Sequence, residues 1–186
     1  RIIRLLAFIV SIFTPALYIA LTTHNQEALP LPFLLNFMAQ RESVPFSALT
    51  EALFMSISFE ILRESDIRKQ SSTGSAVSIL GGLILGDAAV SAGIISPIMI
   101  IVISISAISG LAFSSQEMIA SLRWLRFLMM FLAMFFGIFG IYIGFLFLLS
   151  SLVTTKALDY PYFAPFSPLV KEELGDAIIK LRSNKR

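Results

Sequence analysis

Three carboxylates stand inside otherwise apolar stretches of this sequence. Glu51 and Glu60 lie within residues 46–62, and Asp87 lies within residues 77–93. An ionisable side chain inside hydrocarbon costs about 2.5–3.5 kcal/mol at a helix centre on membrane-insertion scales. A chain that only had to lie in lipid would not keep such groups. We therefore expect these stretches to face other parts of the protein or water.

Asp87 has the chemistry of a cation-selective site. Leu80, Leu83, Ile84 and Val90 lie close to its face at helical spacing. In a symmetric oligomer with this face turned inward, Asp87 would form a carboxylate ring that selects cations. Leu83 or Ile84 would then form an apolar constriction that gates by dewetting. The alternative is that Asp87, near the end of its helix, is solvated or paired with a neighbouring group.

Small residues recur on the same predicted helix. Ser78, Gly82 and Gly86 follow one another at intervals of four residues. Small side chains on one face let membrane helices approach closely, because their association depends on packing rather than on hydrophobic exclusion. This spacing predicts a helix-packing interface, either between subunits or within a single subunit.

The two glutamates are too far apart on a helix to act as an acid–base pair. Glu51 and Glu60 are nine residues apart, so they face roughly opposite sides of a straight helix. A helix that is polar on two sides is expected to lie between other helices and to make intramembrane polar contacts. Such contacts could form a cation path or a contact between subunits. Alternatively, Glu60 and Glu64 are interfacial charges paired with Arg63 or Arg68.

The sequence offers no residues for enzymatic catalysis. It has no cysteine and a single histidine, His24, and it lacks Ser/His/Asp, HExxH, P-loop and GxGxxG patterns. We therefore expect no catalytic residue, no cofactor and no metal site.

Composition indicates an integral membrane protein. The chain has 186 residues, of which 56% are hydrophobic and 14% are charged, and its mean hydropathy is +0.85. The net charge of +2 is too small to suggest nucleic acid as a partner. Basic residues gather at the ends of apolar runs, which suits contact with membrane lipids.

The predicted fold is all-α, with about five membrane helices and a short soluble C-terminal tail. Residues 77–93 and 97–113 are separated by a tight turn, so we expect an antiparallel helical hairpin over 77–113. The domain organisation is a helical membrane domain over 1–153 and a juxtamembrane tail over 154–186. The connecting segments are expected to be a polar loop over 22–44 and an amphipathic interfacial segment over 114–126. The five predicted membrane helices cover residues 5–21, 46–62, 77–93, 97–113 and 127–152.

Several sequence blocks resemble the GerA family of spore germination proteins. They are PFSALTEALFMSISFEILRESDIR, GSAVSILGGLILGDAAVSAGIISP, AISGLAF, RWLRF and DYPYFAPFSP. The resemblance runs in order over residues 5–168. It is to the A subunit of nutrient germinant receptors and to its relative from the spore stage V operon.

The resemblance implies a place in the inner membrane of the bacterial endospore. It also implies a ring oligomer, such as a pentamer, that works with a transporter-like B subunit and a lipoprotein C subunit. The A subunit would form a nutrient-gated channel that releases monovalent cations at the start of germination. Family A subunits carry a large cytoplasmic domain before their first span, so we expect this chain to be the membrane portion and its tail.

Two other functions compete with the channel. The first is a scaffolding subunit of a spore membrane complex that forms no pore, a role that the stage V relative suggests. A secondary transporter is a less favoured reading, because it predicts broken helices around a site near mid-membrane, and no internal repeat is evident.

Overall fold

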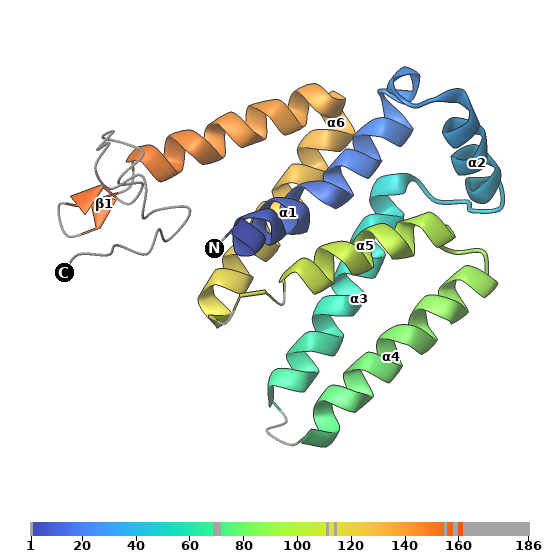
Figure 1. Ribbon diagram of the computed structural model, residues 1–186. Coiled ribbons are helices and arrows are strands. Elements are labelled where there is room, and N and C mark those ends of the chain that lie inside the picture. The colour runs from blue at the N-terminus through green and yellow to red at the C-terminus, as the bar shows by residue number, and fades with distance from the viewer. Residues whose placement is uncertain are drawn as a thin grey trace, which may run out of the picture.

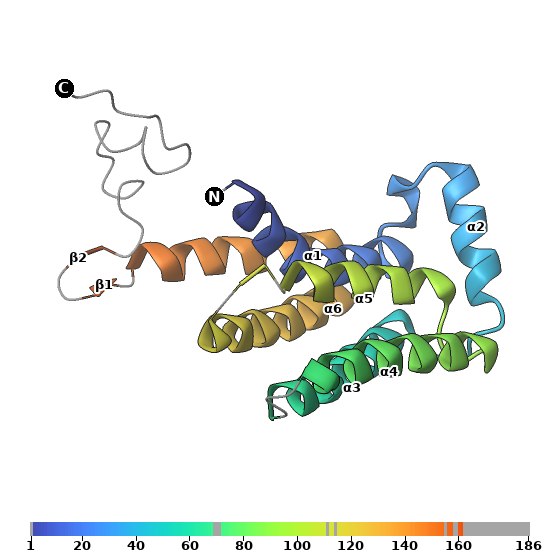
Figure 2. The same cartoon turned by 60° about the horizontal axis from the view of Figure 1, so that its bottom comes forward.

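The polypeptide is helical along most of the length that the structure describes. The computed structural model describes residues 2–68, 72–110, 112–113, 115–154, 156–157 and 160–161. Helices α1, α5 and α6 lie together on one side of the bundle, and α3 and α4 run along the other side (Figures 1 and 2). The elements are α1 (Ile2–Thr23), η1 (Gln26–Ala28), α2 (Leu31–Arg41), α3 (Ala48–Arg68), α4 (Ser72–Ser91), α5 (Pro97–Gly110), α6 (Gln116–Thr154), β1 (Lys156–Ala157) and β2 (Tyr160–Pro161).

Helix α1 supplies the centre of the core. Its side chains Ile12, Ala16 and Ile19 are fully buried, and α1 makes its main contacts with α6 and α5. A hydrogen bond of 2.6 Å from the Ser106 hydroxyl to the Ser11 carbonyl joins α5 to α1. Burial on this scale follows from the apolar composition of α1 and fixes the helix between its two neighbours.

Helix α6 is broken at Gly137. Gly137 has φ 61° and ψ −142°, which lies outside the helical region. The chain turns back there, so the second half (residues 138–154) folds toward the first half (residues 116–136) (Figure 1). A side chain at Gly144 would approach the Met129 sulfur to 2.6 Å, and one at Gly140 would meet the Leu132 carbonyl. Glycines therefore permit both the reversal and the close approach of the two halves.

Two residues that follow α1 bond to the backbone groups exposed by this break. In an unbroken helix the Ile138 N–H would donate to the Met134 carbonyl. Here the Ile138 N–H donates to Asn25 Oδ1 at 3.0 Å. The Met134 carbonyl accepts from His24 Nε2 at 2.5 Å. The end of α1 thus satisfies both groups.

The reversal corrects the prediction of one long span over 127–152. The apolar run was recognised, but Gly137 divides it into two helices. The predicted interfacial segment 114–126 is also wrong as a separate element, because its helical part continues into α6 without interruption.

Gly93 makes the turn between α4 and α5, where its φ of 66° suits glycine. Near this turn Gly86 faces Ile100 on α5. Farther from the turn α4 and α5 diverge (Figures 1 and 2), and α3 packs against both. The tight turn is present, but a paired hairpin over 77–113 is not confirmed.

The segment predicted as a polar loop contains helix α2. Pro30 and Pro32 stand at its start, where proline fits because the first helical N–H groups have no helical partner. Leu31, Leu35 and Met38 lie on one exposed stripe of this helix. Sequence reasoning weighed the polar and proline content of 22–44 and overlooked this spacing.

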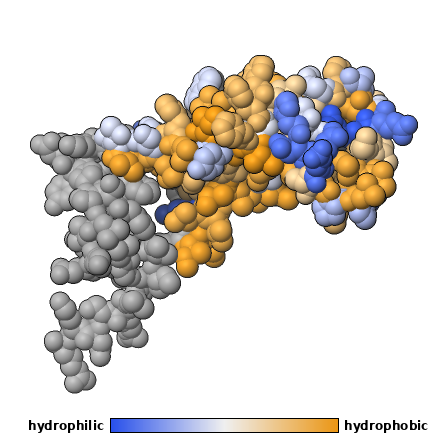
Figure 3. Space-filling view, turned by 90° about the horizontal axis from the view of Figure 1, so that it is seen from above, coloured by the Kyte–Doolittle hydropathy of each residue, from blue (hydrophilic) through white to orange (hydrophobic). Residues whose placement is uncertain are grey.

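Two described helices have the length and composition of membrane spans. They are Ile2–Thr23 and Glu117–Thr154, and Pro97–Gly110 is a shorter apolar helix. Large aromatic side chains on α6, including Phe135 and Phe147, are exposed. Figure 3 shows a broad apolar surface over the bundle, with hydrophilic side chains gathered toward the end that carries α2. Such a surface suits lipid, while five spans remain a prediction.

In the tail, β1 and β2 form a two-stranded antiparallel ribbon. The other residues of the predicted tail domain, 155, 158–159 and 162–186, lie outside the described residues.

We expect Gly137→Ala to destabilise the fold by about 1–3 kcal/mol, because a side chain must adopt a strained backbone conformation there. A Cβ at this position would also lie 2.5 Å from Asn25 Oδ1. Thermal unfolding in detergent measures the effect. Gly86→Ala is the matched control, since its Cβ would sit at an ordinary 3.7 Å from Ile100. Equal melting temperatures for the two variants would contradict this account of the break.

Candidate functional site

Glu51 is a buried carboxylate at the start of α3. It is 1% exposed, and its Oε2 accepts hydrogen bonds from the backbone N–H and the hydroxyl of Ser96, both at 2.8 Å. Its Oε1 lies 3.4 Å from Arg41 Nη2. Ser96 directly precedes α5, so the negative charge stands at the positive end of that helix. Glu51 therefore ties α2, α3 and the start of α5 together.

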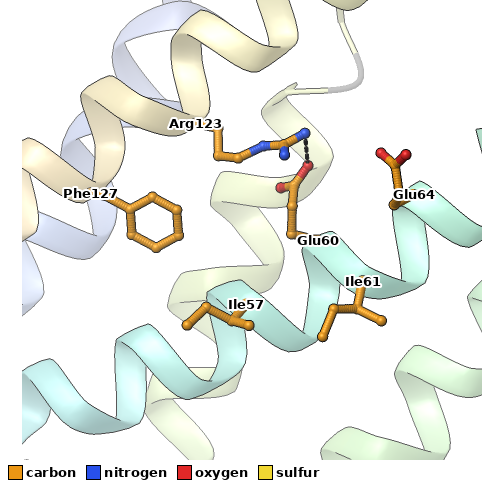
Figure 4. A pocket seen from close by; sticks show the side chains of 6 residues that line it. All are labelled: Ile57, Glu60, Ile61, Glu64, Arg123 and Phe127. Carbon is orange, nitrogen blue, oxygen red and sulfur yellow. Dashed lines mark ion pairs between the residues drawn. The ribbon is translucent and has the colours of Figure 1, made fainter.

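Glu60 belongs to a separate cluster on the same helix. It forms an ion pair with Arg123 of α6 (Figure 4). Sequence reasoning offered Arg63 or Arg68 as its partner, yet the structure gives a partner from a different helix. The two predicted polar contacts, Glu51 and Glu60, thus join α3 to different parts of the bundle.

The small residues of α4 pack inside the chain. A side chain at Gly82 would approach Phe59 of α3 to 3.3 Å, and one at Gly86 would lie 3.7 Å from Ile100 of α5. Gly82 therefore lets α4 approach α3 closely, whereas at Gly86 an added Cβ would make only an ordinary contact with α5. The packing surface seen for Gly82 and Gly86 is therefore within one subunit.

The opposite face of α4 is open. Ile84 is 59% exposed, and Asp87 and Ser91 on the same face are exposed as well. Val90 is half-buried, so it lies at the edge of this face rather than on it. Helix α4 lies at the margin of the bundle (Figures 1 and 2), and its main contacts are with α3. Asp87 and Ile84 are thus available to another molecule.

Ser78, Leu80 and Leu83 lie on the α4 backbone, but their side chains fall outside the described residues. Their roles as interface or pore residues remain predictions.

The residues that bind the two glutamates were missed by sequence reasoning. Ser96 stands before Pro97, and serine before a helix-starting proline is a recognisable N-cap signal. Arg123 precedes the apolar part of α6, but nothing in its spacing from Glu60 indicates contact. His24, the single histidine, bonds to the Met134 carbonyl of α6, a contact that its sequence position does not indicate.

The described residues contain no group of three or more His, Cys, Asp or Glu side chains that could hold a metal ion. The polar clusters around Glu51 and Glu60 instead join helices, and Asp87 stands apart from them on the open face of α4.

A double-mutant cycle can measure the contact between Glu51 and Ser96. We expect Glu51→Gln and Ser96→Ala to couple by about 1.5–3 kcal/mol, the range for hydrogen bonds to charged groups. The free energy of unfolding in detergent gives this value, and the loss of the Arg41 pair cancels within the cycle. Ser96→Ala combined with Glu42→Gln, at an exposed acid, should be additive. Additivity for Glu51 and Ser96 would show that the bond contributes nothing.

The chain is similar to known proteins along almost its whole length. The family model of the Bacillus/Clostridium GerA spore germination protein matches residues 1–186. Spore germination protein KA of Bacillus subtilis (strain 168) is 40% identical over 181 residues, which are 97% of this chain and 33% of that protein. The uncharacterized membrane protein YfkQ of the same strain is 39% identical over 180 residues, covering 97% of this chain and 35% of that protein.

Spore germination protein GerQA of Bacillus cereus is 35% identical over 181 residues, covering 97% of this chain and 36% of that protein. The chain therefore spans about a third of the length of these relatives. No solved structure matches it. The family match over residues 1–186 and the 40% identity to spore germination protein KA show that the chain belongs to the GerA family of spore germination proteins.

Proposed function

We propose that this chain is the membrane portion of a germinant receptor A subunit and that α4 lines a cation channel in a ring oligomer. The open face of α4 carries the argument. Its glycines are used for packing inside the chain, which leaves Ile84 and Asp87 facing outward. An exposed carboxylate beside an apolar side chain is costly against lipid but useful against water or a neighbouring subunit.

A ring gives this face an environment that the single chain lacks. Copies of α4 around an axis would place Asp87 side chains in one layer and Ile84 side chains about one helical turn away. The acid layer would attract cations, and the apolar layer would close the path by dewetting. The full receptor would add a nutrient-sensing B subunit and a lipoprotein C subunit in the inner membrane of the spore. No step in this role requires enzymatic catalysis.

The scaffold alternative requires α4 to pack entirely against its own subunit. The exposure of Ile84 and Asp87 does not favour it. The transporter alternative requires a broken helix with free ends at a substrate site. Helix α6 is broken, but His24 and Asn25 already occupy the two groups freed there. These observations support the channel over both alternatives.

We expect Ile84→Ala, placed in the whole protein, to make spores lose potassium without nutrient, because trimming an apolar constriction lowers its dewetting barrier. Potassium release from dormant spores is the measurement. Ile101→Ala is the matched control, since Ile101 of α5 is similarly exposed, at 58%. Leu83→Ala tests the neighbouring position in the same assay. If both α4 variants retain potassium at normal protein levels, α4 does not form the gate.

Asp87→Asn removes one charge from each subunit without changing the shape of the side chain. We expect weaker selection of cations over anions, because the ring loses its negative field. Reversal potentials across a salt gradient, measured on the reconstituted receptor, report this selectivity. Glu42→Gln, at an exposed acid outside α4, should leave the ratio unchanged. An unchanged ratio in Asp87→Asn would remove Asp87 from the ion path.

A further inference from the structure

A cluster of arginines surrounds Glu60 where α3 meets α6. Arg123 forms the ion pair with Glu60, and Arg63 and Arg126 are also close enough to be attracted by this carboxylate. Arg63 lies near Gly110 at the end of α5. Several guanidinium groups from two helices thus share Glu60.

Arg126 is the most deeply buried arginine of this cluster. It is 6% exposed, and among the described residues its Nε has no hydrogen-bond partner. Glu60 attracts it, while Arg63 and Arg123 repel it. A buried cation that lacks a matching anion is costly. The cluster would therefore be stabilised by an additional negative charge.

An apolar groove opens beside this cluster. Ile57 and Ile61 of α3 and Phe127 of α6 form its apolar wall, and the Glu60–Arg123 pair stands at one edge (Figure 4). Its volume is about 380 Å³. Glu64 also lines the groove, at an exposed position, and makes an interaction of its own.

Trp124, next to Arg123 in sequence, is 74% exposed. An exposed tryptophan beside arginines at the start of an apolar helix is typical of the membrane–water boundary. The groove therefore combines a basic edge at headgroup depth with an apolar wall that continues along the helices.

We propose that this groove binds an anionic phospholipid, with the phosphate on Arg123 and an acyl chain along Ile57, Ile61 and Phe127. Arg126 and Arg63 share Glu60 with Arg123 and add to the positive potential at the phosphate. Basic pockets between membrane helices bind anionic headgroups by this chemistry. A planar guanidinium also matches the phosphate oxygens in a bidentate manner. The inference does not depend on channel activity.

The test is native mass spectrometry of the purified chain with equal amounts of phosphatidylglycerol and phosphatidylcholine of the same acyl length. We expect wild type to retain phosphatidylglycerol in preference. Arg123→Gln should lower this retention about fivefold, the effect of one basic residue near a membrane surface. Arg4→Gln is the matched control, because it removes the same charge from an exposed position on α1 and should leave retention unchanged.

Removing Arg123 leaves Glu60 without its partner, so a second variant guards against misfolding. Arg123→Lys keeps a positive charge beside Glu60 but not the planar guanidinium, so it should preserve the fold and lower the preference for phosphatidylglycerol only in part. Phe127→Ala leaves every charge in place and should weaken retention of both lipids.

Four outcomes would overturn the proposal. Equal retention of the two lipids would remove the headgroup site, and an equal loss in Arg4→Gln would reduce the effect to general surface charge. Displacement of the lipid by inorganic phosphate would show that the groove binds the phosphate group and not the acyl chain. A dimer that forms through the groove would make it a contact between subunits.

Discussion

The fold depends on one helical hydrogen bond that is not made. At Gly137 the Met134 carbonyl and the Ile138 N–H no longer bond to each other, in a helix made mostly of apolar residues. Neither group could remain unpaired without a cost of several kcal/mol in hydrocarbon. His24 bonds to the carbonyl and Asn25 bonds to the N–H. Because both residues directly follow α1, the same contacts fix the end of α1 against α6, and α1 in turn fills the centre of the core.

The acids of α3 connect the remaining helices to this centre. Glu51 holds the start of α5 and the end of α2, and Glu60 holds α6. Each of these two acids has a specific partner, which favours one arrangement of helices over others that would leave the acid unpaired. Packing of the glycines of α4 against α3 then completes the bundle and leaves the outer face of α4 without a partner in the described chain.

The sequence predicts the helical class and the importance of the acids, because both are local signals. Apolar runs reveal helices, and Glu51 and Glu60 stand out against their surroundings. Their partners cannot be predicted in this way, since Ser96 and Arg123 meet them only through tertiary packing. The break at Gly137 could not be predicted from the sequence either, because glycine is common in membrane helices. The reversal is stabilised here by hydrogen bonds with His24 and Asn25, which lie far away in the sequence. Helix α2 was not predicted, because its prolines were interpreted as a sign of a loop, whereas they stand at the start of the helix.

The reversal in α6 changes the number of times that this helix can cross a membrane from odd to even. Because α6 folds back, its C-terminal end returns toward the side of the bundle where α6 begins (Figure 1). If the bundle stands upright in a membrane, α6 then contributes an even number of passes, and β1 and β2 follow on the side where α6 begins. A single glycine would therefore set the side of the membrane on which the chain leaves the bundle.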